Sequence, residues 1–215
     1  MKIKKTIRNL FTLIIATGFI TGCVSANYKK GASTAAALTK SSAMITKGST
    51  FIDESLANLN DLVSNPNPDL RKQFRAFNAS VNDLSSTAKD VASQAEEMKS
   101  QGAAYFAKWD AEAAKMRNED IRNRSEDRRN EVASRFGRIS QHYDETKTAF
   151  QPFLSDLRDV QRFLATDLTA GGLAAIREVA AKAIRDAMPL QASFRKLSEE
   201  FKGLGLSMSP TVPAK

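Results

Sequence analysis

Apolar residues recur at alternating intervals of three and four along one long stretch of the chain. The members of this series are Phe74, Phe77, Val81, Leu84, Ala88, Val91, Ala95, Met98, Gly102, Tyr105 and Trp109, and ten of the eleven are apolar. Such spacing keeps one stripe of a helix facing a partner helix along its whole length. We therefore expect the stretch from Asp69 to Lys115 to form one helix, about 70 Å long at about 1.5 Å per residue.

Two later segments carry series of the same kind. They are Val132, Phe136, Ile139, Tyr143, Thr146, Phe150, Phe153, Leu157, Val160 and Leu164, and then Leu173, Ile176, Ala180, Ala183, Ala187, Leu190, Phe194, Leu197 and Phe201. An earlier series, with Leu38, Ile45, Ile52 and Leu59 seven residues apart, is weakened by Gly48 and by many Ser and Thr. No sustained period-two alternation predicts a strand. The expected fold is all-α: an elongated antiparallel coiled coil or up-and-down bundle of about four long helices.

Polar residues mark the breaks between these helices. Asn65 to Asp69 (NPNPD) indicates a turn that ends in a candidate N-cap, Asp69. Asn118 and Thr169 are candidate caps for the two later helices. Short connections make neighbouring helices antiparallel. Pro152 and Pro189 lie within the apolar series and are expected to bend their helices or to start new turns.

The N-terminal segment has the features of a secretory signal peptide. Four cations, Lys2, Lys4, Lys5 and Arg8, precede an apolar run from Leu10 to Ile20. This run is far shorter than the roughly 20 residues that span a bilayer. Ile20 to Cys23 (ITGC) resembles the bacterial lipobox, which implies cleavage before Cys23 and attachment of diacylglycerol to its sulfur. Two or more acyl chains would anchor the protein stably to a membrane.

Cys23 is the only cysteine, so an internal disulfide is excluded. An incidental thiol and a nucleophile remain as alternatives to lipidation, but a nucleophile needs a base, and the only histidine, His142, is distant in sequence. Val24 stands where an aspartate would favour inner-membrane retention in a Gram-negative cell. We therefore expect a lipid anchor on the periplasmic face of the outer membrane, with the outer face of the inner membrane or the soluble periplasm as alternatives.

These features divide the chain into four parts. Residues 1–22 form the signal peptide, 23–30 the lipidated N-terminus and tether, 31–203 a single helical bundle, and 204–215 a disordered tail. The tail is expected because residues 202–215 (KGLGLSMSPTVPAK) contain two Gly and two Pro and show no helical period.

The charge pattern argues against nucleic-acid binding. The four cations of the signal peptide account for half of the formal net charge of +8. In the densest charged run, residues 117–131 (RNEDIRNRSEDRRNE), arginines alternate with acids, and no aromatic residue follows until Phe136. A helix surface with ion pairs three and four residues apart explains this run best. Anionic lipid headgroups or lipopolysaccharide are the alternative, with Arg122 and Arg128 as candidate contacts.

Few residues suggest chemistry. Tyr105 and Trp109 together favour either core packing or stacking on a carbohydrate, and they are the other candidate ligand contacts. His142, beside Tyr143 and Asp144, is expected to be a surface histidine. No phosphate-binding glycine loop, paired-cysteine site, histidine cluster or serine elbow is present. We therefore expect no catalytic, cofactor-binding or metal-binding residues, no cofactor, and a protein that is not an enzyme.

The stretch from Tyr105 to Ile176 resembles the C-terminal half of a bacterial family of helical, lipoprotein-signalled proteins of unknown function. Trp109 with Asp110 and Glu112, Tyr143, and three phrases carry the resemblance: MRNEDIRNRSEDRR, FQPFLSDLRDV and FLATDLTAGGLAAI. The resemblance implies an envelope location and a long helical fold. It transfers no site residues, because the family has no established activity.

Two functions follow as hypotheses. The first is a lipid-anchored scaffold, spacer or adaptor in the periplasm, which binds an envelope protein and contacts the membrane through Cys23. The second is a module that holds peptidoglycan or a lipid in a groove between helices. A homo-oligomer is a further possibility, because heptad spacing can be satisfied within one chain or between two.

Overall fold

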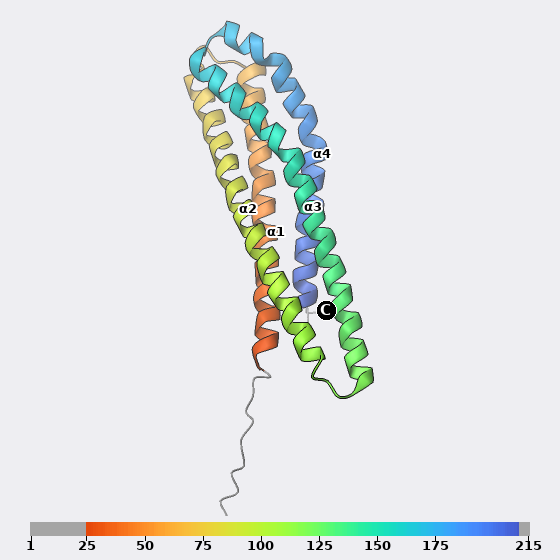
Figure 1. Cartoon of the computed structure of the whole chain (residues 1–215). Coiled ribbons are helices and arrows are strands. Elements are labelled where there is room, and N and C mark those ends of the chain that lie inside the picture. Colours follow the sequence, from red (N-terminus) through yellow and green to blue (C-terminus); the bar gives the residue numbers. More distant parts are fainter. Residues whose placement is uncertain (1–24, 211–215) are drawn as a thin grey trace, which may run out of the picture.

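The computed structural model describes residues 25–210. Four long helices make up this part of the chain: α1 (Ser25–Ser64), α2 (Arg71–Ala113), α3 (Glu119–Thr166) and α4 (Ala170–Met208). No residue between 25 and 210 belongs to a strand. The predicted all-α bundle of four long helices is therefore confirmed (Figure 1). The signal peptide and Cys23 lie outside the described residues.

The helices form a ring in chain order, with α1 and α3 each packed between α2 and α4. Consecutive helices run in opposite directions (Figure 1). The α1–α2 and α3–α4 loops share one end of the bundle, which we call the two-loop end. The start of α1, the end of α4 and the α2–α3 loop lie toward the other, which we call the terminal end. The described part of the chain therefore begins and ends at the same end of a long bundle.

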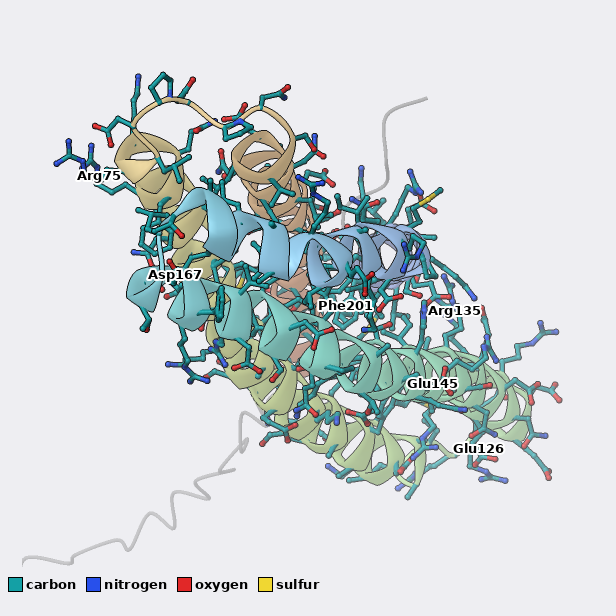
Figure 2. All side chains as sticks on the ribbon, turned by 90° about the horizontal axis from the view of Figure 1, so that it is seen from above. Arg75, Glu126, Arg135, Glu145, Asp167 and Phe201 are labelled. Atoms are coloured by element: carbon teal, nitrogen blue, oxygen red, sulfur yellow. The ribbon has the colours of Figure 1, made fainter. Side chains whose placement is uncertain are left out.

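The apolar series face the interior, as their spacing predicts. Every member of the three series is buried or half-buried, and so are Leu38, Ile45, Ile52 and Leu59 of α1. In the view from above, Phe201 lies between the helices, whereas Arg75 and Glu126 extend away from them (Figure 2). Each large apolar side chain buried in this way contributes about 1.5–3 kcal/mol. Burial of these stripes, more than helix propensity, therefore holds the helices together.

The buried side chains form two clusters, one toward each end. The two-loop core comprises Ile52, Leu59, Leu62, Phe77, Val81, Leu84, Phe150, Phe153, Leu154, Leu157, Val160, Leu164, Leu173, Ile176, Ala180, Ala183, Ala187 and Leu190. The terminal core comprises Leu38, Ile45, Ala95, Met98, Val132, Ile139, Tyr143, Leu197, Phe201 and Leu204. The half-buried ring of Phe194 packs against both clusters.

Two of the three predicted caps are confirmed. The Asn118 side chain accepts a hydrogen bond from the Ile121 N–H at 3.1 Å. The Thr169 hydroxyl accepts one from the Gly172 N–H at 3.1 Å. The third differs by one residue, because Leu70 occupies the N-cap position of α2 and makes no side-chain capping bond. Asp69, directly before it, accepts a hydrogen bond from the Arg71 N–H at 3.1 Å, as a capping side chain does, and pairs with the Arg71 guanidinium at 2.8 Å.

The two internal prolines do not interrupt their helices. Pro152 lies within α3 and Pro189 within α4, and both side chains are exposed. Proline removes one backbone donor and crowds the preceding turn, so such a helix bends away from the proline. Both helices follow curved paths in Figure 1, as expected from the sequence.

The helical region extends beyond the predicted bounds at both ends. Residues 25–30, predicted as tether, belong to α1. Helix α4 continues to Met208, and Leu204 is fully buried, so the predicted tail does not start at residue 204. A Cβ at Gly205 would lie 3.0 Å from the Ala35 carbonyl oxygen. This glycine therefore permits a close approach of α4 to α1, although the sequence around it predicts a tail. Within residues 25–208, none of the helices carries an apolar stretch able to cross a bilayer.

Candidate functional site

The structure brings the two predicted aromatic contacts together at the terminal end. The rings of Tyr105 and Trp109 meet edge to face with their centroids 5.4 Å apart. Both side chains are half-buried, and the Trp109 indole N–H donates to the Ser125 hydroxyl at 2.8 Å. That bond joins α2 to α3 and satisfies the only polar group of Trp109. The indole is therefore held in one orientation by the fold.

Further rings continue this aromatic cluster toward the interior. Phe106 lies 5.5 Å from Tyr105 and 5.7 Å from Phe136, between ring centroids. The guanidinium of Arg129 lies over the Phe106 ring at 5.3 Å from its centroid. Burial raises the pKa of Tyr105, which keeps its hydroxyl protonated. The cluster thus packs α2 against α3 with one face toward solvent.

That open face lines a shallow recess of about 350 Å³. Tyr28 of α1, which is 59% exposed, and Met208 of α4 form the opposite wall. Tyr105 and Trp109 contribute their outer edges to it. The recess gives a ligand such as a sugar ring access to the aromatic pair.

The arginine-rich run pairs with acids and backbone oxygens. Arg128 binds Glu131 at 2.6 Å and donates to the Ser207 carbonyl oxygen at 3.1 Å, which ties α3 to the end of α4. Arg122 lies 3.8 Å from the Glu119 carboxylate and donates to the Met116 carbonyl oxygen at 3.4 Å. These contacts match the expected ion-paired surface, and they occupy the two arginines that were candidate ligand contacts.

His142 has a partner that the sequence does not indicate. Its Nδ1 lies 2.8 Å from the Glu200 carboxylate, and its side chain is only 17% exposed. The predicted surface histidine is therefore a half-buried link between α3 and α4. Helix registry decides this pairing, and no sequence spacing reports registry between distant helices. Between residues 25 and 210, no cluster of His, Cys, Asp or Glu side chains is arranged to hold a metal ion.

The structure also contains a groove that the sequence analysis missed. It has a volume of about 410 Å³ and lies between α2 and α3, midway along the bundle. Its α2 wall runs from Leu84 to Ala92 and its α3 wall from Tyr143 to Arg158, and Phe194 lies at its floor. The lining is mostly apolar. A volume of this size falls within the range of small-molecule sites, about 300–1,000 Å³.

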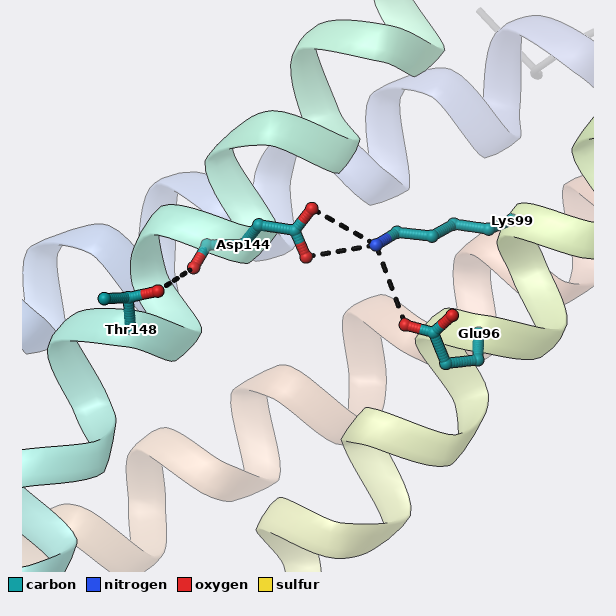
Figure 3. A network of polar contacts seen from close by, with 4 residues as sticks. All are labelled: Glu96, Lys99, Asp144 and Thr148. Carbon is teal, nitrogen blue, oxygen red and sulfur yellow. Dashed lines mark hydrogen bonds and ion pairs between the residues drawn. The ribbon is translucent and has the colours of Figure 1, made fainter.

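Polar contacts between α2 and α3 bound this groove at both ends. Toward the terminal end, the Lys99 ammonium binds both carboxylate oxygens of Asp144 at 3.0 and 3.2 Å (Figure 3). Glu96 lies 3.7 Å from the same ammonium, and the Asp144 backbone oxygen accepts from Thr148 at 2.8 Å. Hydrogen bonding to Asp144 raises the pKa of Lys99, so the bridge stays charged.

Toward the two-loop end, the Arg158 guanidinium donates to the Ser85 hydroxyl. Gln161 continues the contact one turn further by donating to Asn78 and to Asn82 at 3.2 Å. Among the described residues, no polar contact joins α2 and α3 between the Arg158 and Lys99 bridges. Polar contacts therefore join α2 and α3 at both ends of the groove, but none among the described residues joins the two helices along the groove itself.

One buried polar atom faces this gap without a partner. The Thr146 side chain lines the groove and is 5% exposed, and its hydroxyl oxygen has no hydrogen-bond partner within the described residues. Nearby, burial raises the pKa of Tyr143 to about 12. At the mouth, Lys89 and Lys147 are exposed and form no ion pair with any described residue. A weak polarity signal, Thr146 in an otherwise apolar series, was the only trace of this site in the sequence.

A third concave surface lies at the two-loop end. It measures about 860 Å³ and is bounded by both loops, including Asn67 and Leu168. The α1–α2 loop is fixed by Gln73, which accepts from the Asn67 N–H at 2.9 Å and donates to the Asp61 carboxylate at 2.7 Å. The Gln73 side chain is buried, so its contacts hold the loop in a defined shape.

Comparison with known proteins gives one match. A family model described as a protein of unknown function, DUF2959, matches residues 30–201, which is most of the chain. A search of curated proteins and a search of solved structures both found no match. The resemblance to a helical family of unknown function is thereby confirmed, whereas its lipoprotein signal stays a prediction. The chain belongs to the DUF2959 family of proteins of unknown function.

Proposed function

We propose that this protein is a lipid-anchored, non-enzymatic scaffold, spacer or adaptor of the bacterial envelope. In this proposal Cys23 carries the lipid, and the bundle extends from the periplasmic face of the outer membrane. The observation that carries the proposal is the placement of the α1 start and the two-loop end at opposite ends of the bundle (Figure 1). Cys23 lies two residues before Ser25, where α1 begins.

The length of α1 sets the reach of such a scaffold. Its 40 residues span about 60 Å at about 1.5 Å per residue. A lipid at Cys23 would hold the terminal end near the membrane, and the two-loop end would stand away from it by that distance. The α1–α2 loop is held in shape by the buried Gln73, which suits a surface presented to a partner. The partner in this proposal is another envelope protein, and nucleic acid is not among the partners.

Metabolic labelling with an alkyne fatty acid tests the anchor. The wild-type chain and Cys23→Ala are expressed in the same Gram-negative host and followed by membrane fractionation. We expect label on the wild-type protein only, and release of the Cys23→Ala protein from the outer-membrane fraction. An unlabelled wild-type protein would overturn the anchor.

Site-specific photocrosslinking tests the role of the two-loop end. A photoreactive amino acid is placed at Asn67 or Leu168, with exposed Ser155 on the side of α3 as the matched control. The adaptor proposal expects a discrete crosslinked envelope protein from the two loop positions and none from Ser155. Equal crosslinking from all three positions, or none from any, would contradict presentation at this end.

The recess beside Trp109 favours peptidoglycan binding as a second candidate function. Three of its lining residues, Tyr28, Tyr105 and Trp109, are aromatic, and their rings offer apolar surface for contact with a sugar. A peptidoglycan pull-down of wild type and Trp109→Ala tests it, with Phe163→Ala as a control at an exposed ring far from the recess. Retention lost only in Trp109→Ala supports binding, and the absence of retention by wild type excludes it.

A further inference from the structure

We propose that the groove between α2 and α3 binds the acyl chain of a free long-chain fatty acid, with its carboxylate at Lys89 and Lys147. This site is distinct from the recess at Trp109 and from the predicted anchor at Cys23. It rests on the described residues alone, so it does not depend on the proposed scaffold function.

The shape of the groove fits one extended hydrocarbon chain. The α3 wall covers the 16 residues from Tyr143 to Arg158, about 22 Å along the helix, and the α2 wall covers the nine residues from Leu84 to Ala92, about 12 Å. The groove is a slot between the antiparallel helices α2 and α3, so it accepts a ligand that is long and narrow. A long-chain fatty acid has this length and width, whereas a folded peptide or a sugar polymer is too wide for a volume of about 410 Å³.

The polarity of the lining favours an apolar body. The wall combines buried side chains of the two-loop core with half-buried apolar ones: Leu84, Phe150 and Leu154, and Ala88, Val91 and Phe194. Apolar surface left facing water is unfavourable in proportion to its area, so covering it with hydrocarbon is favourable. The small side chains of Ala88 and Ala92 leave the space in which that hydrocarbon would lie.

The charges at the mouth select an anionic headgroup. Lys89 on α2 and Lys147 on α3 flank the opening, and neither forms an ion pair with a described residue. A third cation lines the groove, Arg158, but its guanidinium already donates to the Ser85 hydroxyl toward the two-loop end. Two unpaired ammonium groups beside an apolar slot complement a carboxylate on an alkyl chain. Lysine stems also pack on the first methylenes while the ammonium stays in water.

The unpartnered Thr146 hydroxyl points to the same occupant. Its oxygen is buried against the groove, where a polar atom without a partner is unfavourable. The neighbouring Lys147 places a cation one residue away. A carboxylate near this end of the slot would accept from the Thr146 hydroxyl and from Lys147, and so complete the hydrogen bonding of both.

The predicted lipid at Cys23 is not this occupant. Helix α1 begins at Ser25, and Ile45, the first α1 residue of the groove, lies 20 residues further along. That separation is about 30 Å along the helix axis. The start of α1 therefore lies about 30 Å from the groove, and in this proposal the groove takes a separate molecule.

A photoactivatable fatty acid tests the proposal. The full chain, purified into nanodiscs of zwitterionic phospholipid, is irradiated with a diazirine-labelled palmitic acid, and labelled peptides are identified by mass spectrometry. We expect labels within residues 84–92 and 143–158. The label is added to purified protein without acyl-transfer enzymes, so it reports the groove and not the anchor. Labels spread over the outer faces of the helices, or found only near the N-terminus, would overturn the proposal.

Two variants with matched controls separate the chain from the headgroup. Ala92→Phe fills the slot, and we expect at least a tenfold loss of labelling, whereas Ala103→Phe at an exposed site on the same helix has no effect. Lys89→Glu with Lys147→Glu should weaken binding at least tenfold, whereas Lys72→Glu leaves it unchanged. Thermal melting verifies that each variant folds. Retention of full labelling by Ala92→Phe or by the folded lysine variant would overturn the site.

Competition identifies the headgroup. Unlabelled palmitic acid should compete at least tenfold better than hexadecanol, which has the same chain and no charge. Lysophosphatidylglycerol, another anionic single-chain lipid with a bulkier headgroup, should compete more weakly than palmitic acid if the site is specific for a carboxylate. Stronger competition by hexadecanol or by the lysophospholipid would overturn the assignment to a fatty acid.

Discussion

The two ends of the bundle are packed by different means, although the same apolar spacing runs through both. The two-loop core combines Leu, Ile, Val and Phe from all four helices with three alanines of α4, Ala180, Ala183 and Ala187. In the terminal core, small residues let the helices approach, as where the Ser198 hydroxyl lies 2.9 Å from Ser42 and 2.8 Å from Thr46. Rings from one helix fill the space beside glycines of another, as where Tyr105 lies against Gly31.

This difference explains where the groove lies. A slot between two helices closes when large side chains meet, as in the two-loop core, or when a ring covers a glycine, as where Phe136 covers Gly102. Between these regions, Ala88 and Ala92 of α2 and Thr146 of α3 line the slot, and none of them is large enough to close it. The groove therefore lies where the packing changes, from large side chains that meet in the two-loop core to rings that cover glycines toward the terminal end.

The largest expected effect is the loss of the fold when a charge enters the two-loop core. Phe153 is 4% exposed, and Phe153→Asp would bury an unpaired carboxylate there. We expect a cost of several kcal/mol and loss of the cooperative thermal transition, measured by circular dichroism. Ser155→Asp, at an exposed position two residues away, should melt like wild type. A Phe153→Asp protein as helical and as heat-stable as wild type would show that this core does not hold the bundle together.

Truncating one large side chain in each core sharpens the comparison. Leu157→Ala in the two-loop core should cost about 2–5 kcal/mol and Phe201→Ala in the terminal core about 3–5 kcal/mol. Because the groove separates the cores, we expect Phe201→Ala to increase amide exchange mainly in residues 30–48 and 190–208. Leu157→Ala should instead increase amide exchange in all four helices. The same exchange pattern in both variants would mean that the two cores unfold as one unit.

The sequence predicted which residues are buried, because apolar spacing fixes the face that each helix turns inward. It predicted the caps at Asn118 and Thr169 because those depend on residues three positions apart. It did not predict the groove, the His142–Glu200 contact or the close approach at Gly205. These depend on the distance and registry between helices, which arise from all the side chains in an interface together.

Two glycines toward the terminal end, Gly102 and Gly137, should change the stability in opposite directions when each is replaced by alanine. A Cβ at Gly102 would lie 2.4 Å from the Phe136 ring, so Gly102→Ala should destabilise the protein by about 1–3 kcal/mol as the ring is displaced. A Cβ at Gly137 would meet nothing within 4 Å, so Gly137→Ala should stabilise α3 by about 0.5–1 kcal/mol. Urea denaturation measures both. Stabilisation by both substitutions would show that Phe136 does not need the space at Gly102.

Tyr143 makes the stability of the terminal core dependent on alkaline pH. Its pKa rises from 10.0 in the unfolded chain to about 12 in the fold, chiefly through burial. The folded state therefore keeps the proton that the unfolded chain releases, so this contribution is complete below pH 10 and is lost as pH rises toward 12. The loss is on the order of 2 kcal/mol. Urea denaturation at pH 8 to 11.5 should show a shallower decline for Tyr143→Phe than for wild type, and parallel declines would contradict the shift.

The smallest expected effect concerns the Lys99–Asp144 bridge, which bounds the groove toward the terminal end. The Lys99 side chain is 31% exposed and that of Asp144 is 56% exposed, so water and salt screen their attraction. A double-mutant cycle with Lys99→Met and Asp144→Asn should give a coupling of about 0.2–1 kcal/mol, smaller at high salt. The Lys99 ammonium also lies 5.6 Å from the centre of the Tyr143 ring, so Lys99→Met loses that contact as well. Lys99→Met should therefore cost more than Asp144→Asn. If both single variants and the double variant unfold like wild type, the bridge contributes nothing, and α2 is held to α3 between the groove and the terminal end by the other contacts there, such as Phe136 against Gly102 and the Trp109–Ser125 hydrogen bond.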